Sequence, residues 1–328
     1  MPAVQSQDSS ERDRGRDARD PEDIPARGWK DILWRLKDQV RKDRLSIVAA
    51  GVAFYSLLAI FPALIALVAI YGLAFDPAEV EQQVAALGGV LPDQAADVLL
   101  NQLHELTSIN YATLGASAIG GLLLALWSAS TGMRALMAAL NVAYKEDEKR
   151  GFFHLYGTAL LLTLGALFGT VTAIGLVPAL PVALQFLGLE DGMKRYIGIA
   201  AWPILVVTMM FGLAIVYRYG PSRREPRWGW VSWGAVIATL LWLIGSLLFS
   251  AYVSKLGRYN ETYGSIGAII ILLMWFLLSS YAVLFGAELN SEMERQTRRD
   301  TTEGREKPLG KRGAHAADTV GESRPGLF

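Results

Sequence analysis

The residues of this chain that could do chemistry are polar groups inside, or at the ends of, long apolar stretches. Arg134 ends the run Trp127-Ser-Ala-Ser-Thr-Gly-Met-Arg, and Glu288 and Asn290 end a later apolar stretch. Ionisable side chains are costly in hydrocarbon and mark ion pairs or pathways where they occur. An ion pair between Arg134 and Glu288 would let both charges lie at depth. The alternative is that Arg134 reaches lipid headgroups and Glu288 is solvated, as long side chains near helix ends allow.

Two further polar side chains, Tyr55 and Asn141, lie within the apolar stretches. Tyr55 precedes Pro62, which removes a backbone hydrogen bond and is expected to kink its helix. A kinked helix with nearby hydroxyl groups can line a cavity, although Pro and Tyr are also common in ordinary helix packing. The predicted polar path consists of Tyr55, Arg134, Asn141, Glu288 and Asn290.

The familiar sites of soluble enzymes are missing from the sequence. Cysteine is absent, and the only histidines are His104, His154 and His315, which lie far apart in the chain. The sequence contains no Gly-x-x-x-x-Gly-Lys phosphate loop, no His-Glu-x-x-His and no Gly-x-Ser-x-Gly. We therefore expect no cofactor, no metal centre, no enzymatic activity and no nucleic-acid partner.

The elements that must hold these residues are membrane helices. Hydrophobic residues make up 52% of the chain and charged residues only 19%, below the quarter or so of a soluble domain. A spanning helix needs about 20 residues. Gly165 and Gly169 form a Gly-x-x-x-Gly pattern, which predicts close approach of helix backbones. The six predicted spans are 47–73, 112–133 (continuing as a helix to residue 144), 155–177, 197–217, 230–252 and 265–286.

The distribution of Lys and Arg predicts the orientation of these spans. Six of these residues lie in 30–44 before the first span, and none lies in the first loop, 74–111. Rich and poor loops then alternate in register with six crossings, and positive residues favour the cytoplasmic side. We predict a multi-pass membrane protein, partnered by the lipid bilayer, with both termini in the cytoplasm.

The segments outside the spans differ in character. Residues 28–44 combine apolar residues at helical spacing with basic ones, which predicts an amphipathic helix on the membrane surface or packed on the bundle. The loop 74–111 is acidic and is expected to form a small helical cap outside the membrane. The tails 1–27 and 296–328 are polar and charged, so we expect them to be disordered.

Three long motifs carry a family resemblance. They are Asp43–Pro62 (DRLSIVAAGVAFYSLLAIFP), Leu126–Tyr144 and Tyr263–Asn290. Over roughly residues 28–295 the chain resembles the YihY/virulence factor BrkB family of bacterial inner-membrane proteins, once mislabelled as ribonuclease BN. The resemblance implies an all-α, six-helix bundle located in the bacterial inner (plasma) membrane. The family is described as transporters or envelope factors, and the resemblance implies no settled biochemical activity.

The leading functional hypothesis is a transporter or exporter of a small solute or lipid-like molecule, along a path between the first, second and sixth spans. Without an ATP site, transport would be passive or driven by an ion gradient, and Glu288 could carry a proton. The alternative is a non-transporting envelope scaffold or assembly factor. An enzyme, including a ribonuclease, has no residues to support it.

Overall fold

The computed structural model describes residues 13–74, 115–186, 191–255 and 257–324. The expected cap at 74–111 lies outside these ranges except for residue 74. Side chains are described for 13–66, 120–172, 203–254, 267 and 269–324. The elements are η1 (Pro21–Asp23), α2 (Ala26–Lys42), α3 (Leu45–Ala74), α6 (Gly115–Tyr144), α7 (Phe152–Phe186), α8 (Asp191–Tyr219), α9 (Trp228–Lys255), α10 (Gly257–Glu294) and α11 (His315–Asp318).

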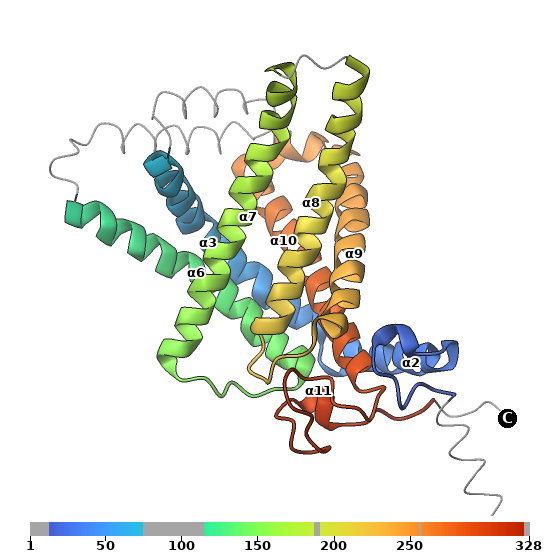
Figure 1. Ribbon diagram of the computed structural model, residues 1–328. Coiled ribbons are helices and arrows are strands. Elements are labelled where there is room, and N and C mark those ends of the chain that lie inside the picture. The colour runs from blue at the N-terminus through green and yellow to red at the C-terminus, as the bar shows by residue number, and fades with distance from the viewer. Residues whose placement is uncertain (1–12, 75–114, 187–190, 256, 325–328) are drawn as a thin grey trace, which may run out of the picture.

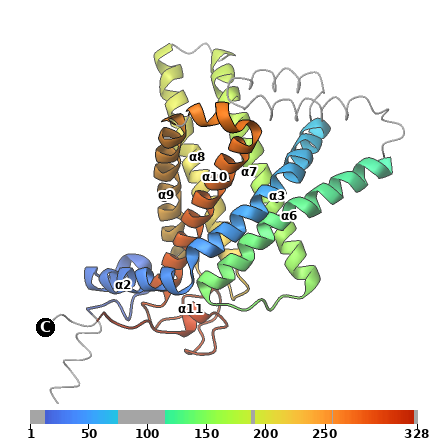
Figure 2. The same cartoon turned by 180° about the vertical axis from the view of Figure 1, so that it is seen from behind.

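The six long helices form a closed ring. Each of α3, α6, α7, α8 and α9 packs against the next long helix in the chain, and α10 packs back against α3 and α6. Figures 1 and 2 show the helices close together at one end, where α2 and α11 also lie, and splayed apart at the other. We call the close end the base. The ring is closed by contacts between the first and last long helices, so distant parts of the sequence meet there.

The helices confirm an all-α, polytopic membrane architecture. Within the described residues, five helices are long and apolar enough to cross a membrane, in α3, α6, α7, α9 and α10. In α8 the described apolar segment, Pro203–Tyr219, is shorter. Helix α7 continues to Phe186, beyond residue 177, where the third span is predicted to end. Six crossings remain a prediction.

Buried packing concentrates at the base. One cluster joins Leu45, Leu140, Tyr217 and Leu284 from four different helices, each 1% exposed or less. Toward the splayed end the same helices present large apolar side chains outward, such as Leu124 at 67% exposure. Apolar side chains facing outward on long helices suit a hydrocarbon solvent. The base is therefore the part of the molecule that is held together by packing between its own helices.

Close backbone approach occurs between α9 and α10. A Cβ atom on Gly234 would overlap the carbonyl oxygen of Gly286, and one on Gly286 would lie 2.5 Å from both the Gly234 carbonyl oxygen and the Tyr217 hydroxyl. The predicted pair, Gly165 and Gly169, has open space at the Cβ position within the described part of the chain. The spacing pattern therefore indicated the wrong glycines, because only the tertiary contact decides which glycine is needed.

Gly286→Ala is expected to destabilise the protein by about 1–3 kcal/mol, the usual cost of forcing extra atoms into a packed site. Thermal unfolding in detergent measures the change. Gly212→Ala in α8 is the matched control, since its Cβ would meet no described atom within 4 Å. Equal stability of the two variants would contradict the close packing of α9 on α10.

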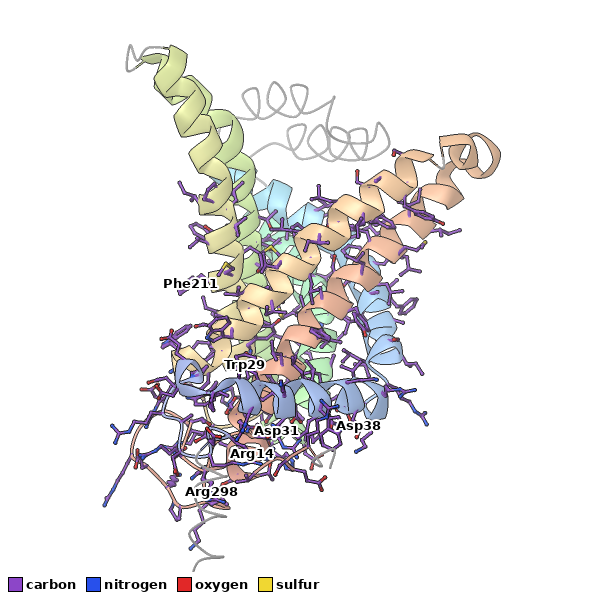
Figure 3. The ribbon with its side chains drawn as sticks, turned by 90° about the vertical axis from the view of Figure 1, so that its right-hand side faces the viewer. Arg14, Trp29, Asp31, Asp38, Phe211 and Arg298 are labelled. Carbon is purple, nitrogen blue, oxygen red and sulfur yellow. The ribbon has the colours of Figure 1, made fainter. Side chains whose placement is uncertain are left out.

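Helix α2 crosses the base, as Figure 3 shows. Ile32 and Leu36 are buried against Trp230 and Met293. The guanidinium of Arg35 donates from Nε to Glu292 on α10 at 2.6 Å, and both side chains are buried. The apolar face of the predicted amphipathic helix thus packs on the bundle, which is one of the two arrangements its sequence allowed.

The described parts of both tails are ordered against the base, in contrast to the expected disorder of 1–27 and 296–328. Arg16 donates to the backbone oxygens of Gln296 and Gly321, at 3.2 and 2.7 Å. Arg14 forms an ion pair with Asp31 of α2 at 2.8 Å. These tails lack an apolar periodicity, and paired polar groups from distant segments hold them instead.

Docking of the C-terminal tail is expected to weaken in acid. Burial lowers the pKa of His315 below its ordinary value, and the charges of Arg295 and Lys145 add to this. A free tail therefore binds a proton more readily than a docked one, so docking weakens progressively as pH falls below about 6.5, the ordinary pKa of histidine. Hydrogen exchange of 296–324, corrected for intrinsic rates, should rise between pH 8 and 5.5. His315→Gln should remove this response, and His154→Gln should retain it; a response unchanged in His315→Gln would contradict the assignment.

Candidate functional site

The most unusual group in the protein is the carboxyl of Glu288, on α10 at the base. Its residue is 0% exposed. Neither carboxyl oxygen receives a hydrogen bond within the described residues. The charged groups that act on it are Asp43, Glu292 and Lys145. A buried carboxylate without donors is costly, and such a group is a strong sign of function in a membrane protein.

A chain of polar contacts links Glu288 to the partly exposed surface of the base. Lys145 donates from Nζ to Gln39 Oε1 at 2.9 Å, and Gln39 donates from Nε2 to Asp43 Oδ2 at 2.5 Å. Asp43 in turn lies beside Glu288. Asp43 and Lys145 are partly exposed, whereas Gln39 is buried. We call Gln39, Asp43, Lys145 and Glu288 the carboxyl cluster.

Tight turns hold the two partly exposed members of the carboxyl cluster. Lys145 follows the end of α6 with φ of 55°, and Arg44, directly after Asp43, has φ of 49°. Residues other than glycine rarely adopt this left-handed conformation, which costs free energy. Both turns bring the ends of α2, α3 and α6 to the Glu288 side of α10.

Asn141 and Asn290 are also buried at the base, where they fasten backbone segments. Asn290 accepts a hydrogen bond from the Gly234 backbone at 2.8 Å and donates to the Val231 carbonyl at 3.3 Å. Asn141 accepts from the Ser222 backbone at 2.7 Å and donates to Glu148 at 3.0 Å. Their side-chain groups are thus engaged with fixed partners, and we assign both a positioning role.

Arg134 does not pair with Glu288. Its guanidinium donates to the hydroxyls of Tyr156 and Thr131, at 2.9 and 2.8 Å. It also lies over the Tyr156 ring, 4.4 Å from the centroid, and near Trp127. Arginine stacks readily on aromatic faces at a membrane interface. The hypothesis of an Arg134–Glu288 pair is therefore wrong, because Tyr156 of α7 contacts Arg134 instead, and the sequence could not place these two residues together.

Tyr55 and Pro62 lie on α3, away from the carboxyl cluster. Tyr55 is 45% exposed and packs edge-on against Phe54. Pro62 lies inside α3, which runs on as a helix to Ala74. A path that includes Tyr55 stays a prediction, and so does a kink at Pro62. Of the five predicted path residues, Asn141, Glu288 and Asn290 are buried at the base, and the two asparagines hydrogen-bond to other segments there.

The sequence analysis missed a second buried charge system next to this site. Arg223 donates from Nη2 to Glu294 Oε2 at 2.6 Å, and both side chains are 0% exposed. The guanidinium also lies over the Tyr144 ring, 4.8 Å from its centroid. In the sequence, Arg223 is one of several arginines in a loop rich in positive charge, where an exposed side chain would be expected. A buried partner seventy-one residues away gives no local signal.

Comparison with known proteins decides the family. The family model for virulence factor BrkB matches residues 36–310. This chain belongs to the BrkB family. A relative described as ribonuclease-like, YfkH of Bacillus subtilis, is 31% identical over 253 residues, which are 76% of this chain and 90% of the relative.

Two further relatives are described as UPF0761 membrane proteins. That of Idiomarina loihiensis is 28% identical over 226 residues, covering 67% of this chain and 75% of its own. That of Cronobacter sakazakii is 24% identical over 271 residues, covering 81% and 88%. No solved structure matches significantly. Together with the long apolar helices, these names establish a membrane-embedded BrkB protein.

The described residues of this chain were also compared with the ligand sets that hold metal ions. No group of three or more His, Cys, Asp or Glu side chains is arranged there to hold a metal ion. Several charged groups at the base are paired with one another, such as Arg35 with Glu292 and Arg223 with Glu294.

Proposed function

We propose that this BrkB protein transports a small solute or lipid-like molecule across the bacterial inner membrane. The observation that carries this proposal is the Glu288 carboxyl, fully buried among helices without a hydrogen-bond donor in the described residues. A structural ion pair would give such a group a partner. A carboxyl group that gains and loses a proton during a transport cycle must not be held in its charged form by a fixed donor or cation, and Glu288 has no such donor in the described residues.

The carboxyl cluster supplies a route for that proton. Asp43 lies beside Glu288 and is partly exposed, so a proton from solvent could pass through Asp43 to Glu288. The gathering of Lys and Arg residues at the base favours a cytoplasmic location for it. Transport would then be driven by the proton gradient, with release or uptake of the proton on the cytoplasmic side.

The proposed path runs between α3, α6 and α10. These helices pack together at the base, and α10 contacts both of the others. The ring widens away from the base (Figures 1 and 3). A ring closed at one end and splayed at the other fits one state of an alternating-access cycle. Opening the base would require the contacts around Glu288 to separate.

The test is movement of probes in sealed vesicles of phosphatidylethanolamine and phosphatidylglycerol containing the purified full chain. Lipid movement is followed with fluorescent phosphatidylglycerol, quenched in the outer leaflet by dithionite, and solute movement by osmotic swelling in amino acids, sugars and polyols. Protein-dependent movement of one class, changed by an imposed proton gradient, is expected. Movement equal to that of protein-free vesicles for every probe would favour the envelope-scaffold alternative.

A further inference from the structure

The outward side of α2 carries a row of basic side chains. Lys30, Lys37 and Arg41 are spaced so that they fall on one side of an α-helix, and all three are exposed. The opposite side of α2 packs on the bundle through Ile32 and Leu36. The three basic side chains, which we call the basic row, therefore point away from the protein's own helices.

The basic row is not neutralised by the described part of the chain. No ion pair involves any of its three members there, whereas the acidic side chains Asp31 and Asp38 of α2 pair with Arg14 and Lys42. Like charges four residues apart on a helix, as in the second and third members of the row, repel one another. The row thus offers an open positive surface, and an anionic partner would relieve the repulsion.

The two edges of α2 show where the basic row lies along the molecule. On one edge, Trp29 packs edge-on against Trp233 of α9, with ring centroids 6.1 Å apart. On the other edge, Asp31 binds Arg14 of the N-terminal tail. Helix α2 crosses the base between the long helices and the tails (Figure 3). Tryptophan concentrates at headgroup depth, so the row lies at the level expected for lipid headgroups.

Exposed apolar side chains border the row on the side of the long helices. Leu33, one turn after Trp29 on the same edge of α2, is 55% exposed, and Ile47 at the start of α3 is 67% exposed. Helices that lie in a membrane interface place such an edge among acyl chains, while Lys and Arg side chains reach the headgroups. A soluble acidic protein would need no apolar border, so the surface favours a lipid partner.

We propose that the basic row binds the headgroups of anionic phospholipids in the leaflet at the level of the base. Each Lys or Arg near an anionic membrane surface strengthens the attraction about fivefold, and the effect is screened by salt. The proposal is independent of transport, because enrichment of one lipid beside α2 needs no movement across the membrane.

The test measures which lipids surround α2. The chain contains no cysteine, so Ala26→Cys, at an exposed position one turn before Lys30, provides a single site for a fluorophore. The labelled full chain is placed in phosphatidylcholine vesicles containing a small fraction of a quencher lipid. This lipid carries a nitroxide on its acyl chain near the headgroup and is either phosphatidylglycerol or phosphatidylcholine. We expect quenching to show about a fivefold or greater local enrichment of phosphatidylglycerol at low salt, falling toward parity at high salt.

A triple variant in the same labelled chain decides whether the basic row is the binding surface. Lys30→Gln, Lys37→Gln and Arg41→Gln together should bring quenching by the two lipids to parity. Because these side chains are exposed and unpaired in the described residues, thermal unfolding of the variant should match that of the parent chain.

The matched control removes the same charge from another part of the base. Arg305→Gln, Lys307→Gln and Lys311→Gln together act on exposed side chains of the C-terminal tail, which lies beyond the ends of the long helices (Figure 1). This variant should keep the enrichment. Equal quenching by the two lipids around the parent chain at low salt would overturn the proposal. Equal enrichment in the two triple variants would overturn it as well.

Discussion

Arg223→Ala should lower the free energy of unfolding by about 3–5 kcal/mol, the usual cost of leaving one partner of a buried ion pair alone. The side chains of Arg223 and Glu294 are both 0% exposed, and among the described residues Glu294 would keep only the hydroxyl of Thr301 as a hydrogen-bond partner. The variant also loses the stacking of the guanidinium on the Tyr144 ring. Equilibrium unfolding in mixed micelles measures the change.

Two further variants make this prediction specific. Arg227→Ala, in the same link, removes a guanidinium that is 38% exposed and 3.9 Å from Glu306, so a loss of at most about 1 kcal/mol is expected. The double variant Arg223→Met with Glu294→Leu should recover most of the lost stability, since apolar groups of similar size leave no buried charge unpaired. A loss from Arg223→Ala no larger than that from Arg227→Ala would contradict the buried pair.

Glu288→Gln should reduce gradient-driven transport at least tenfold while leaving the fold intact. The amide keeps the shape of the side chain but cannot exchange a proton. Because the Glu288 carboxyl has no donor in the described residues, its replacement by a neutral group should be neutral or stabilising. A loss of transport without a loss of stability would distinguish a transport role for Glu288 from a structural role.

The control for this variant is Asp147→Asn, which removes an exposed carboxylate from the neighbouring link. It should leave both transport and stability unchanged. Wild-type transport rates in Glu288→Gln would contradict the role of the buried carboxyl. A strong loss of stability would instead indicate that Glu288 is a structural group.

The helices could be predicted from the sequence because an apolar stretch is a local property. The start of α3 at Leu45 and the end of α6 at Tyr144 agree with the predictions to within a few residues. Closure of the ring by α10 on α3 joins residues more than two hundred positions apart. No local pattern carries that information. The place of Glu288 at the end of an apolar run likewise left open whether its side chain is buried or solvated, and the tertiary packing decides for burial.

The errors of the sequence analysis share a physical cause. Arg134 was paired with Glu288 because both were expected at similar depth, but depth does not define which side of the ring a residue faces. The tails were expected to be disordered because they cannot bury apolar area. Arg16 shows how they are held, since it bonds to backbone oxygens about three hundred residues away. Order of this kind depends on complementary polar partners and leaves no periodic signal.

The most direct test of the account is the initial rate of probe movement in vesicles with an imposed proton gradient, compared between wild type and Glu288→Gln at equal protein content. The account predicts that the wild-type rate responds to the gradient and that the rate of the variant falls at least tenfold and no longer responds. Equal rates in both proteins, with or without the gradient, would contradict it.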